Sequence, residues 1–211
     1  MASSTLPAPS TGRSRFKSIL WISLGVTTLF VFITSEVLLV TDYHMYHAYR
    51  LQVIADRRLL IPHTLAGIFA LLIGPINFSS RIRQRHLQIH RVLGRIYVIS
   101  VFIGAATGVA LASGRPGFPG TSMQAAAWVV CSTAALITAR NRQIIQHRQW
   151  MARSYAVTFT FVSSRVLNLW PRYWSHLGDS LAAVGVIAFT LASLLIVDLG
   201  LNWRELTTRR E

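Results

Sequence analysis

Residues 81–112 read RIRQRHLQIHRVLGRIYVISVFIGAATGVALA, a basic segment followed by an apolar run that holds one charged side chain from Val92 onward. An α-helix needs roughly 20 apolar residues to cross a hydrocarbon core about 30 Å thick, and this run has that length. Backbone hydrogen bonds in lipid are satisfied only in helices or closed barrels, and a continuous apolar run favours a helix. The stretch therefore predicts a transmembrane helix that begins beside a basic loop.

The same pattern recurs along the chain of 211 residues and predicts an all-α, polytopic membrane protein with a bundle of six transmembrane helices. The predicted helices cover residues 19–41, 62–78, 92–112, 122–139, 150–170 and 180–201. The membrane domain is expected over residues 18–203, between a disordered tail of residues 1–17 and a short tail of residues 204–211. Small residues in the third and fourth helices predict that these two pack as a close hairpin.

The distribution of basic residues predicts that both chain termini are cytoplasmic. With that orientation the cytoplasmic loops and ends carry most of the positive charge, which is what the positive-inside rule describes. These residues are Arg13, Arg15, Lys17, Arg81, Arg83, Arg85, Arg91, Arg140, Arg142, Arg148, Arg204, Arg209 and Arg210. We expect a multi-pass protein of the bacterial cytoplasmic (inner) membrane.

The formal net charge of +14 lies in short loops between the helices rather than on one amphipathic surface. We therefore expect it to set the topology and to attract anionic lipid headgroups, at about 1 kcal/mol for each basic side chain near the membrane surface. Nucleic acid, the usual partner of so basic a soluble chain, is not expected.

Four short motifs resemble those of a known family. They are PHTLAG at 62–67, LLIGP at 71–75, HRVLGRIY at 90–97 and HRQWMARSY at 147–155. The chain thereby resembles the bacterial membrane proteins grouped as domain of unknown function 2306, over roughly residues 60–170. The segment that begins at His147 is the most specific part. The resemblance implies a helical membrane protein and assigns no catalytic residue.

Glu36 and Arg165 lie well inside the predicted spans, where charge is costly. Glu36 and Arg165 fall at nearly the same depth, roughly 25 Å and 22 Å from the cytoplasmic edge at the rise of an α-helix. We expect an ion pair between the first and fifth helices. The pair either locks the helices together, or Glu36 is a proton-carrying or substrate-facing carboxyl with catalytic use.

A second set of charges falls near the cytoplasmic edge. Asp198 should lie within about one helical turn of Arg95 and Arg153. Both arginines follow a repeated His-Arg pair, His90-Arg91 in one case and His147-Arg148 in the other. This is either a structural network or a site for an anion such as a lipid phosphate, a haem propionate or a phosphorylated metabolite, because guanidinium groups bind such oxygens bidentately.

The histidines separate into two groups by predicted membrane face. His44, His47, His63 and His176 fall on the outer side, and His86, His90 and His147 fall on the inner side. A transmembrane cytochrome with two b-type haems takes imidazole ligands from facing helices in this way. The candidate ligands are His90 with His147 inside, and His63 with His44 or His47 outside. Interfacial histidines bound only to water or headgroups are the alternative.

Three functions follow from these sites. The first is a small haem b redox protein that passes electrons between a cytoplasmic donor or a quinol and an outer acceptor. The second is an enzyme without a metal that acts on a lipid or isoprenoid, with Glu36 as its acid. The third is a transporter or an assembly factor. The expected partners are the bilayer and a quinone or other hydrophobic small molecule, and the sequence predicts no oligomeric state.

Overall fold

The computed structural model describes residues 22, 25–26, 29–30, 56–168 and 179–207, without the side chains of 164–168, 179–182 and 204–205. Every regular element in residues 56–168 and 179–207 is helical. These helices are α4 (Arg57–Phe78), α5 (Ser80–Arg85), α6 (Leu87–Ala112), α7 (Phe118–Arg140), α8 (Ile144–Asn168) and α10 (Asp179–Thr207). The predicted first helix lies outside the described residues, apart from five positions.

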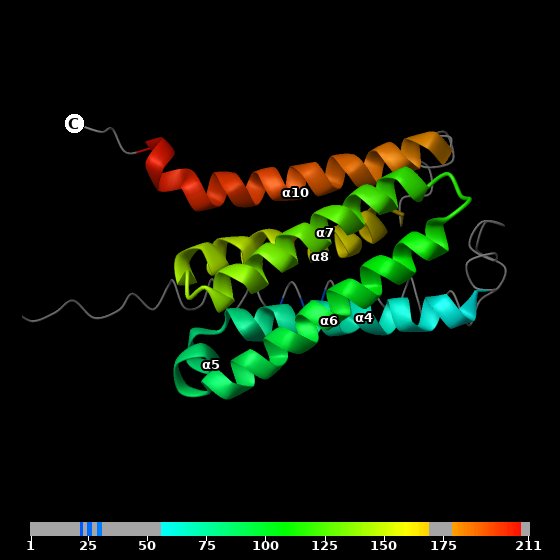
Figure 1. Ribbon diagram of the computed structural model, residues 1–211. Coiled ribbons are helices and arrows are strands. Elements are labelled where there is room, and N and C mark those ends of the chain that lie inside the picture. Colours follow the sequence, from blue (N-terminus) through cyan, green and yellow to red (C-terminus); the bar gives the residue numbers. More distant parts are fainter. Residues whose placement is uncertain (1–21, 23–24, 27–28, 31–55, 169–178, 208–211) are drawn as a thin grey trace, which may run out of the picture.

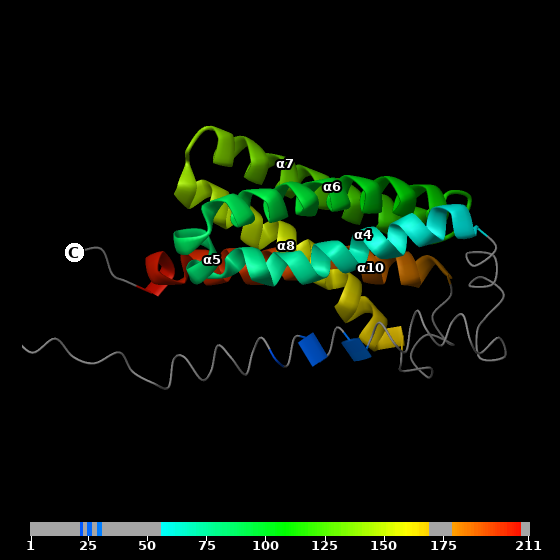
Figure 2. The same cartoon turned by 90° about the horizontal axis from the view of Figure 1, so that it is seen from below.

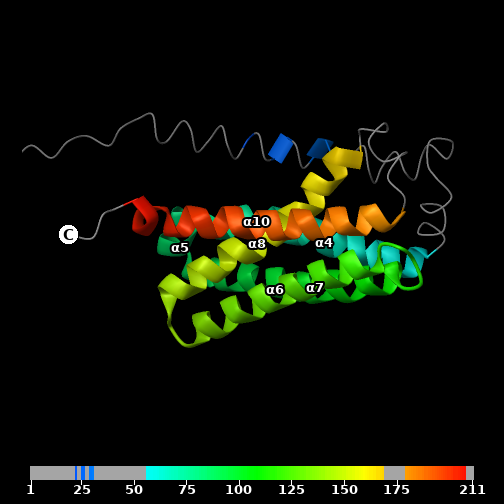
Figure 3. The same cartoon turned by 90° about the horizontal axis from the view of Figure 1, so that it is seen from above.

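Successive long helices run in opposite directions between the two ends of a bundle (Figure 1). We call the end with α5 and the α7–α8 turn the inner end, and the end with the α6–α7 turn the outer end. α4 packs along α6, and α8 packs against α4, α7 and α10. Figures 2 and 3 show α8 crossing the bundle obliquely. The end of α10 also lies at the inner end (Figure 1). Most of the described arginines are there too, on α5, at the start of α6 and around the α7–α8 turn.

For α4 and α6, hydropathy predicted the ends of the helices better than their beginnings, whereas α10 begins near its predicted start and continues six residues beyond its predicted end. α4 and α6 end at Phe78 and Ala112, as predicted, but they begin at Arg57 and Leu87, five residues before the predicted starts. α8 begins at Ile144 rather than at residue 150. The physical reason is that hydropathy marks only the lipid-crossing part, whereas backbone hydrogen bonding continues into the arginine-rich flanks.

Four described helices are long and apolar enough to span a membrane: Arg57–Phe78, Leu87–Ala112, Phe118–Arg140 and Ala183–Trp203. α8 is not one of them, because it carries Arg148 and Arg153 and a row of hydroxyl residues. Its neighbours α4, α7 and α10 pack against it, and its hydroxyl residues Ser154, Thr158 and Thr160 are buried and so shielded from lipid. The structure thus has the helices of a multi-pass membrane protein, while the count of six spans stays a prediction.

Both described turns between long helices use a left-handed residue. Gly114 has a φ of 71° in the outer turn, a conformation that glycine adopts without a steric cost. Arg142 has a φ of 59° in the inner turn. There the amide of Gln143 donates to the Thr138 carbonyl at 2.9 Å, and the amide of Arg142 donates to the Ala139 carbonyl at 3.1 Å. This pair of bonds is a Schellman motif, and it turns the chain directly from α7 into α8.

Two glycines of α6 let the neighbouring helices approach closely. A Cβ atom on Gly104 would lie 3.0 Å from the Trp128 ring of α7, and one on Gly108 would lie 3.0 Å from the His63 ring of α4. Small residues one helical turn apart permit such contacts in membrane bundles. The predicted packing of the third helix on the fourth is therefore confirmed, and the third packs even more extensively on α4.

We predict that Gly74→Ala destabilises the bundle. The added Cβ would lie 2.2 Å from Tyr155 Cε2, and the Tyr155 ring is held edge-on against Phe78, so the ring must move. Overpacking of this kind costs about 1–3 kcal/mol. The buried Cys131 is the only cysteine of the chain, and labelling of its thiol during heating in detergent reports opening of the bundle.

The matched control is Gly67→Ala on the same helix, where the added Cβ meets no atom within 4 Å. We expect this variant to label as slowly as the parent protein or more slowly, because alanine favours a helix by up to about 1 kcal/mol. Equal labelling of the Gly74 and Gly67 variants would contradict the packing described.

Candidate functional site

A chain of buried hydroxyl groups joins α6, α7 and α8 at the middle of the bundle. The Tyr97 hydroxyl lies 2.8 Å from Ser154 Oγ and 2.9 Å from Thr158 Oγ1. Ser132 Oγ lies 2.7 Å from Ser154 Oγ, and Trp128 Nε1 donates to Thr158 Oγ1 at 2.8 Å. Tyr97, Ser132 and Ser154 are completely buried. We call these five residues the hydroxyl network.

The donors of the hydroxyl network can be ordered, because each hydroxyl has one hydrogen. Thr158 donates its hydrogen to the Ser154 carbonyl oxygen at 3.0 Å, so it accepts from Tyr97 and from Trp128. Tyr97 then accepts from Ser154, and Ser154 accepts from Ser132. This series of hydrogen bonds ends at the Ser154 backbone carbonyl, because the single hydroxyl hydrogen of Thr158 is donated there. The hydroxyl hydrogens of the network are therefore all used in bonds within the protein, and these bonds link α6, α7 and α8.

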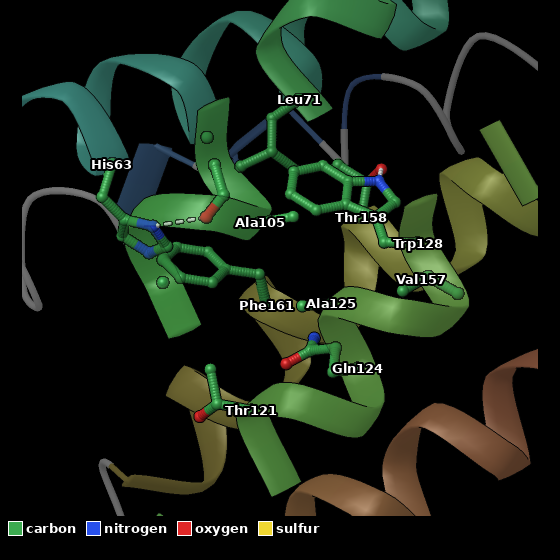
Figure 4. A pocket seen from close by; sticks show the side chains of 13 residues that line it. His63, Leu71, Ala105, Thr121, Gln124, Ala125, Trp128, Val157, Thr158 and Phe161 are labelled. Atoms are coloured by element: carbon green, nitrogen blue, oxygen red, sulfur yellow. Dashed lines mark hydrogen bonds between the residues drawn. The ribbon is translucent and has the colours of Figure 1, made fainter. Parts of the chain in front are cut away.

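On the outer side of the network lies a cavity of about 50 Å³ between α4, α6, α7 and α8 (Figure 4). His63 reaches it from α4, and Thr121 and Gln124 reach it from α7. His63 donates from Nδ1 to the Gly104 carbonyl at 3.0 Å, and its ring meets Phe161 edge-on at 5.9 Å. Most of the remaining lining is apolar, and the volume of the cavity is far below the roughly 300–1,000 Å³ of pockets for drug-sized ligands.

The two inner histidines of the repeated motif lie close enough to interact electrostatically. His147 begins α8 and donates from Nδ1 to the Ala135 carbonyl of α7 at 2.8 Å, which places its lone pair on Nε2. His90 lies in the first turn of α6, and its Nδ1 is buried without a hydrogen-bond partner. The charges of Arg83 and Arg91 also act on His90.

The sequence analysis missed a residue that lies opposite Gly94, which follows His90 by one helical turn. Asn77 of α4 is 5% exposed, and neither its Nδ2 nor its Oδ1 has a hydrogen-bond partner. A buried polar group without a partner costs about 1–3 kcal/mol. Its amide faces Gly94 of α6, where an added Cβ would lie 4.0 Å from Nδ2. The only signal in the sequence was an amide side chain at the end of an apolar run.

Among the predicted anion-binding residues, Arg153 and Asp198 are brought together. Two guanidinium nitrogens of Arg153 approach Asp198 Oδ1 at 2.7 Å, and the guanidinium lies 4.9 Å from the centre of the Trp150 ring. Arg95 is exposed on α6. It precedes the inward-facing Tyr97 by two residues, about 200° around the helix, so it points away from α8. A site shared by Arg95 and Arg153 stays a prediction.

The other predicted site residues are distributed as follows. Arg91 and Arg148 are exposed at the inner end. Glu36, His44 and His47 lie outside the described residues, as does the side chain of Arg165. In the described part of the chain no group of three or more His, Cys, Asp or Glu side chains is placed to hold a metal ion. A site built on two histidines is not excluded by this finding.

The apolar helices and the buried polar groups between them define a polytopic helical membrane protein. A family model described as predicted membrane protein (DUF2306) matches residues 60–200, and the chain belongs to that family. No curated protein and no solved structure matches the chain.

We predict that Tyr97→Phe lowers the free energy of unfolding by about 1–3 kcal/mol, because Ser154 and Thr158 each lose a buried partner. The control is Tyr155→Phe, which removes one bond to the Leu71 carbonyl at 3.2 Å from a half-buried ring. Thermal unfolding in detergent measures both variants. A loss at Tyr155 as large as that at Tyr97 would show that the hydroxyl network does not carry the stability assigned to it.

Proposed function

We propose that the chain is a membrane redox protein that binds haem b at its inner end, with His90 and His147 as axial ligands. The proposal is supported by the placement of these two histidines on different helices at one depth, within electrostatic reach of each other. In helix bundles, b-type haem takes its two axial ligands from imidazoles on different helices. Two histidines suffice, so the lack of a three-residue metal group in the described chain does not oppose it.

The hydrogen bonding of His147 is the single observation that favours this function most. Ligating histidines almost always donate their second ring nitrogen to a carbonyl or carboxylate, which fixes the ring and its tautomer. His147 does so through Nδ1 to Ala135, so Nε2 is the nitrogen oriented for an iron atom. His63 at the outer end has the same bond, to Gly104.

When bound, haem would supply reversible one-electron chemistry. The chain's own residues hold and insulate the site. The Ala135 carbonyl orients His147, and the inner arginines supply positive charge that suits carboxylate groups. The hydroxyl network lies between this site and the outer cavity, and its hydrogen bonds end at the Ser154 carbonyl.

The support for an outer haem is weaker. Its candidate ligand His63 borders a cavity of about 50 Å³, which would have to open to admit a haem. The second outer ligand would be His44 or His47, and both lie outside the described residues. The proposal is therefore made for one haem at the inner end. No described contact favours an enzyme based on Glu36 or a transporter.

We predict that protein purified from haem-replete cells has the reduced spectrum of a bis-histidine haem and that His90→Ala and His147→Ala each abolish it. His86→Ala is the matched control, because His86 is exposed at the same end and should keep the spectrum. Pyridine extraction measures the haem content of all four proteins. Colourless parent protein, or full haem content in the His90 and His147 variants, would refute the proposal.

A further inference from the structure

Three buried polar atoms without partners gather where α4 meets α6 near the inner end. They are Nδ2 and Oδ1 of Asn77 and Nδ1 of His90. In the described residues only one other buried side-chain nitrogen or oxygen, Ser122 Oγ, lacks a hydrogen-bond partner. Native proteins satisfy most buried polar groups, so a cluster of orphaned atoms calls for a specific explanation such as a ligand.

The register of α4 and α6 explains why these atoms share one place. The helices are antiparallel, with His63 opposite Gly108 and Asn77 opposite Gly94. His90 precedes Gly94 by one turn on the same face of α6, about 6 Å closer to the inner end. Gly94 leaves this place open, because a Cβ there would have only Asn77 Nδ2 within 4 Å.

The chemistry of the atoms restricts the occupant. Asn77 offers both a donor and an acceptor, and His90 Nδ1 offers one further position of either kind. A hydroxyl group can satisfy both sides of an amide because it donates and accepts. The charges of Arg83 and Arg91 act on His90, so an oxygen that carries partial negative charge is favoured.

The surroundings indicate that the occupant arrives from lipid. α4 and α6 are long and apolar enough to span the membrane. Exposed apolar side chains lie on these two helices near the level of Asn77 and Gly94. They are Leu72, Ile76, Val92 and Ile96. A ligand that enters between the helices must partition into the bilayer and must present a hydroxyl or carbonyl oxygen.

We propose that Asn77, His90 and Gly94 form a binding site for the head group of a membrane quinol or quinone. The Asn77 amide bonds to one ring oxygen, His90 Nδ1 bonds to the same oxygen, and Gly94 provides the space for the ring edge. Asn77 and Gly94 are new site residues. As the assignment of the redox partner, the proposal rests on the function proposed above. It uses Nδ1 of His90 and leaves Nε2 for the haem.

The experiment measures binding of decylubiquinone to the purified full chain in detergent by quenching of tryptophan fluorescence. We expect Asn77→Leu to weaken binding about tenfold, because it removes the amide hydrogen bonds. Gly94→Ala should weaken binding by at least as much, because its methyl group occupies the space for the ring. Gly200→Ala is the neutral control, because its added Cβ meets no atom within 4 Å and Gly200 lies on a different helix, α10.

The unfolding temperature of the quinone-free protein is a second readout, and we expect it not to fall in the variants that bind quinone more weakly. Asn77→Leu should raise the unfolding temperature of the quinone-free protein, because it removes two orphaned polar atoms. Gly94→Ala should not lower it, because the site has room for a methyl group. Weaker binding without loss of stability separates a ligand site from a structural role.

Several results would overturn the proposal. They are absence of saturable binding by the parent protein, unchanged affinity in both variants, or a lower unfolding temperature in Asn77→Leu. Loss of binding in Gly67→Ala alone would place the quinone in the outer cavity, which Gly67 lines, and would also overturn it. Haem content measured on the same samples keeps the two proposals apart. Quinone binding without haem would refute only the function, and haem without quinone binding would refute only this site.

Discussion

The constraint on which this bundle depends is that a hydroxyl group buried between membrane helices needs a hydrogen-bond partner. α8 carries Ser154 and Thr158 on its buried face, which lipid could not satisfy. Tyr97 from α6 and Ser132 and Trp128 from α7 supply the partners. The most polar long helix is thereby held among its neighbours, and the apolar faces of α4, α6, α7 and α10 remain for the membrane.

The hydroxyl network also separates two regions with different character. Toward the outer end its Thr158 and Trp128 border a small apolar cavity, where His63 is held by a backbone carbonyl. Toward the inner end His147 is held in the same way, but Asn77 and His90 keep buried atoms without partners. The buried polar atoms at the centre all have hydrogen-bond partners, whereas those of Asn77 and of His90 Nδ1 at the inner end do not. This is the pattern expected when local stability is given up for binding.

Depth along the helices could be predicted from the sequence, whereas direction around them could not. Asp198 and Arg153 were placed at one level by counting residues, and they form an ion pair. Arg95 was placed at that level by the same count, yet Tyr97 faces the core and turns Arg95 away from it. Asn77 was missed because a lone amide carries no spacing pattern, and its importance depends on which atoms of another helix fail to reach it.

We infer that the inner end of the bundle is shaped around a bound molecule. The most direct test is an experimental structure of the protein purified in mild detergent without added ligands and resolved well enough to show small molecules. We expect non-protein density in contact with His90, Asn77 and the space over Gly94. Protein side chains or single water molecules that satisfy Asn77 and His90 completely, with no further density between α4, α6 and α8, would contradict the claim.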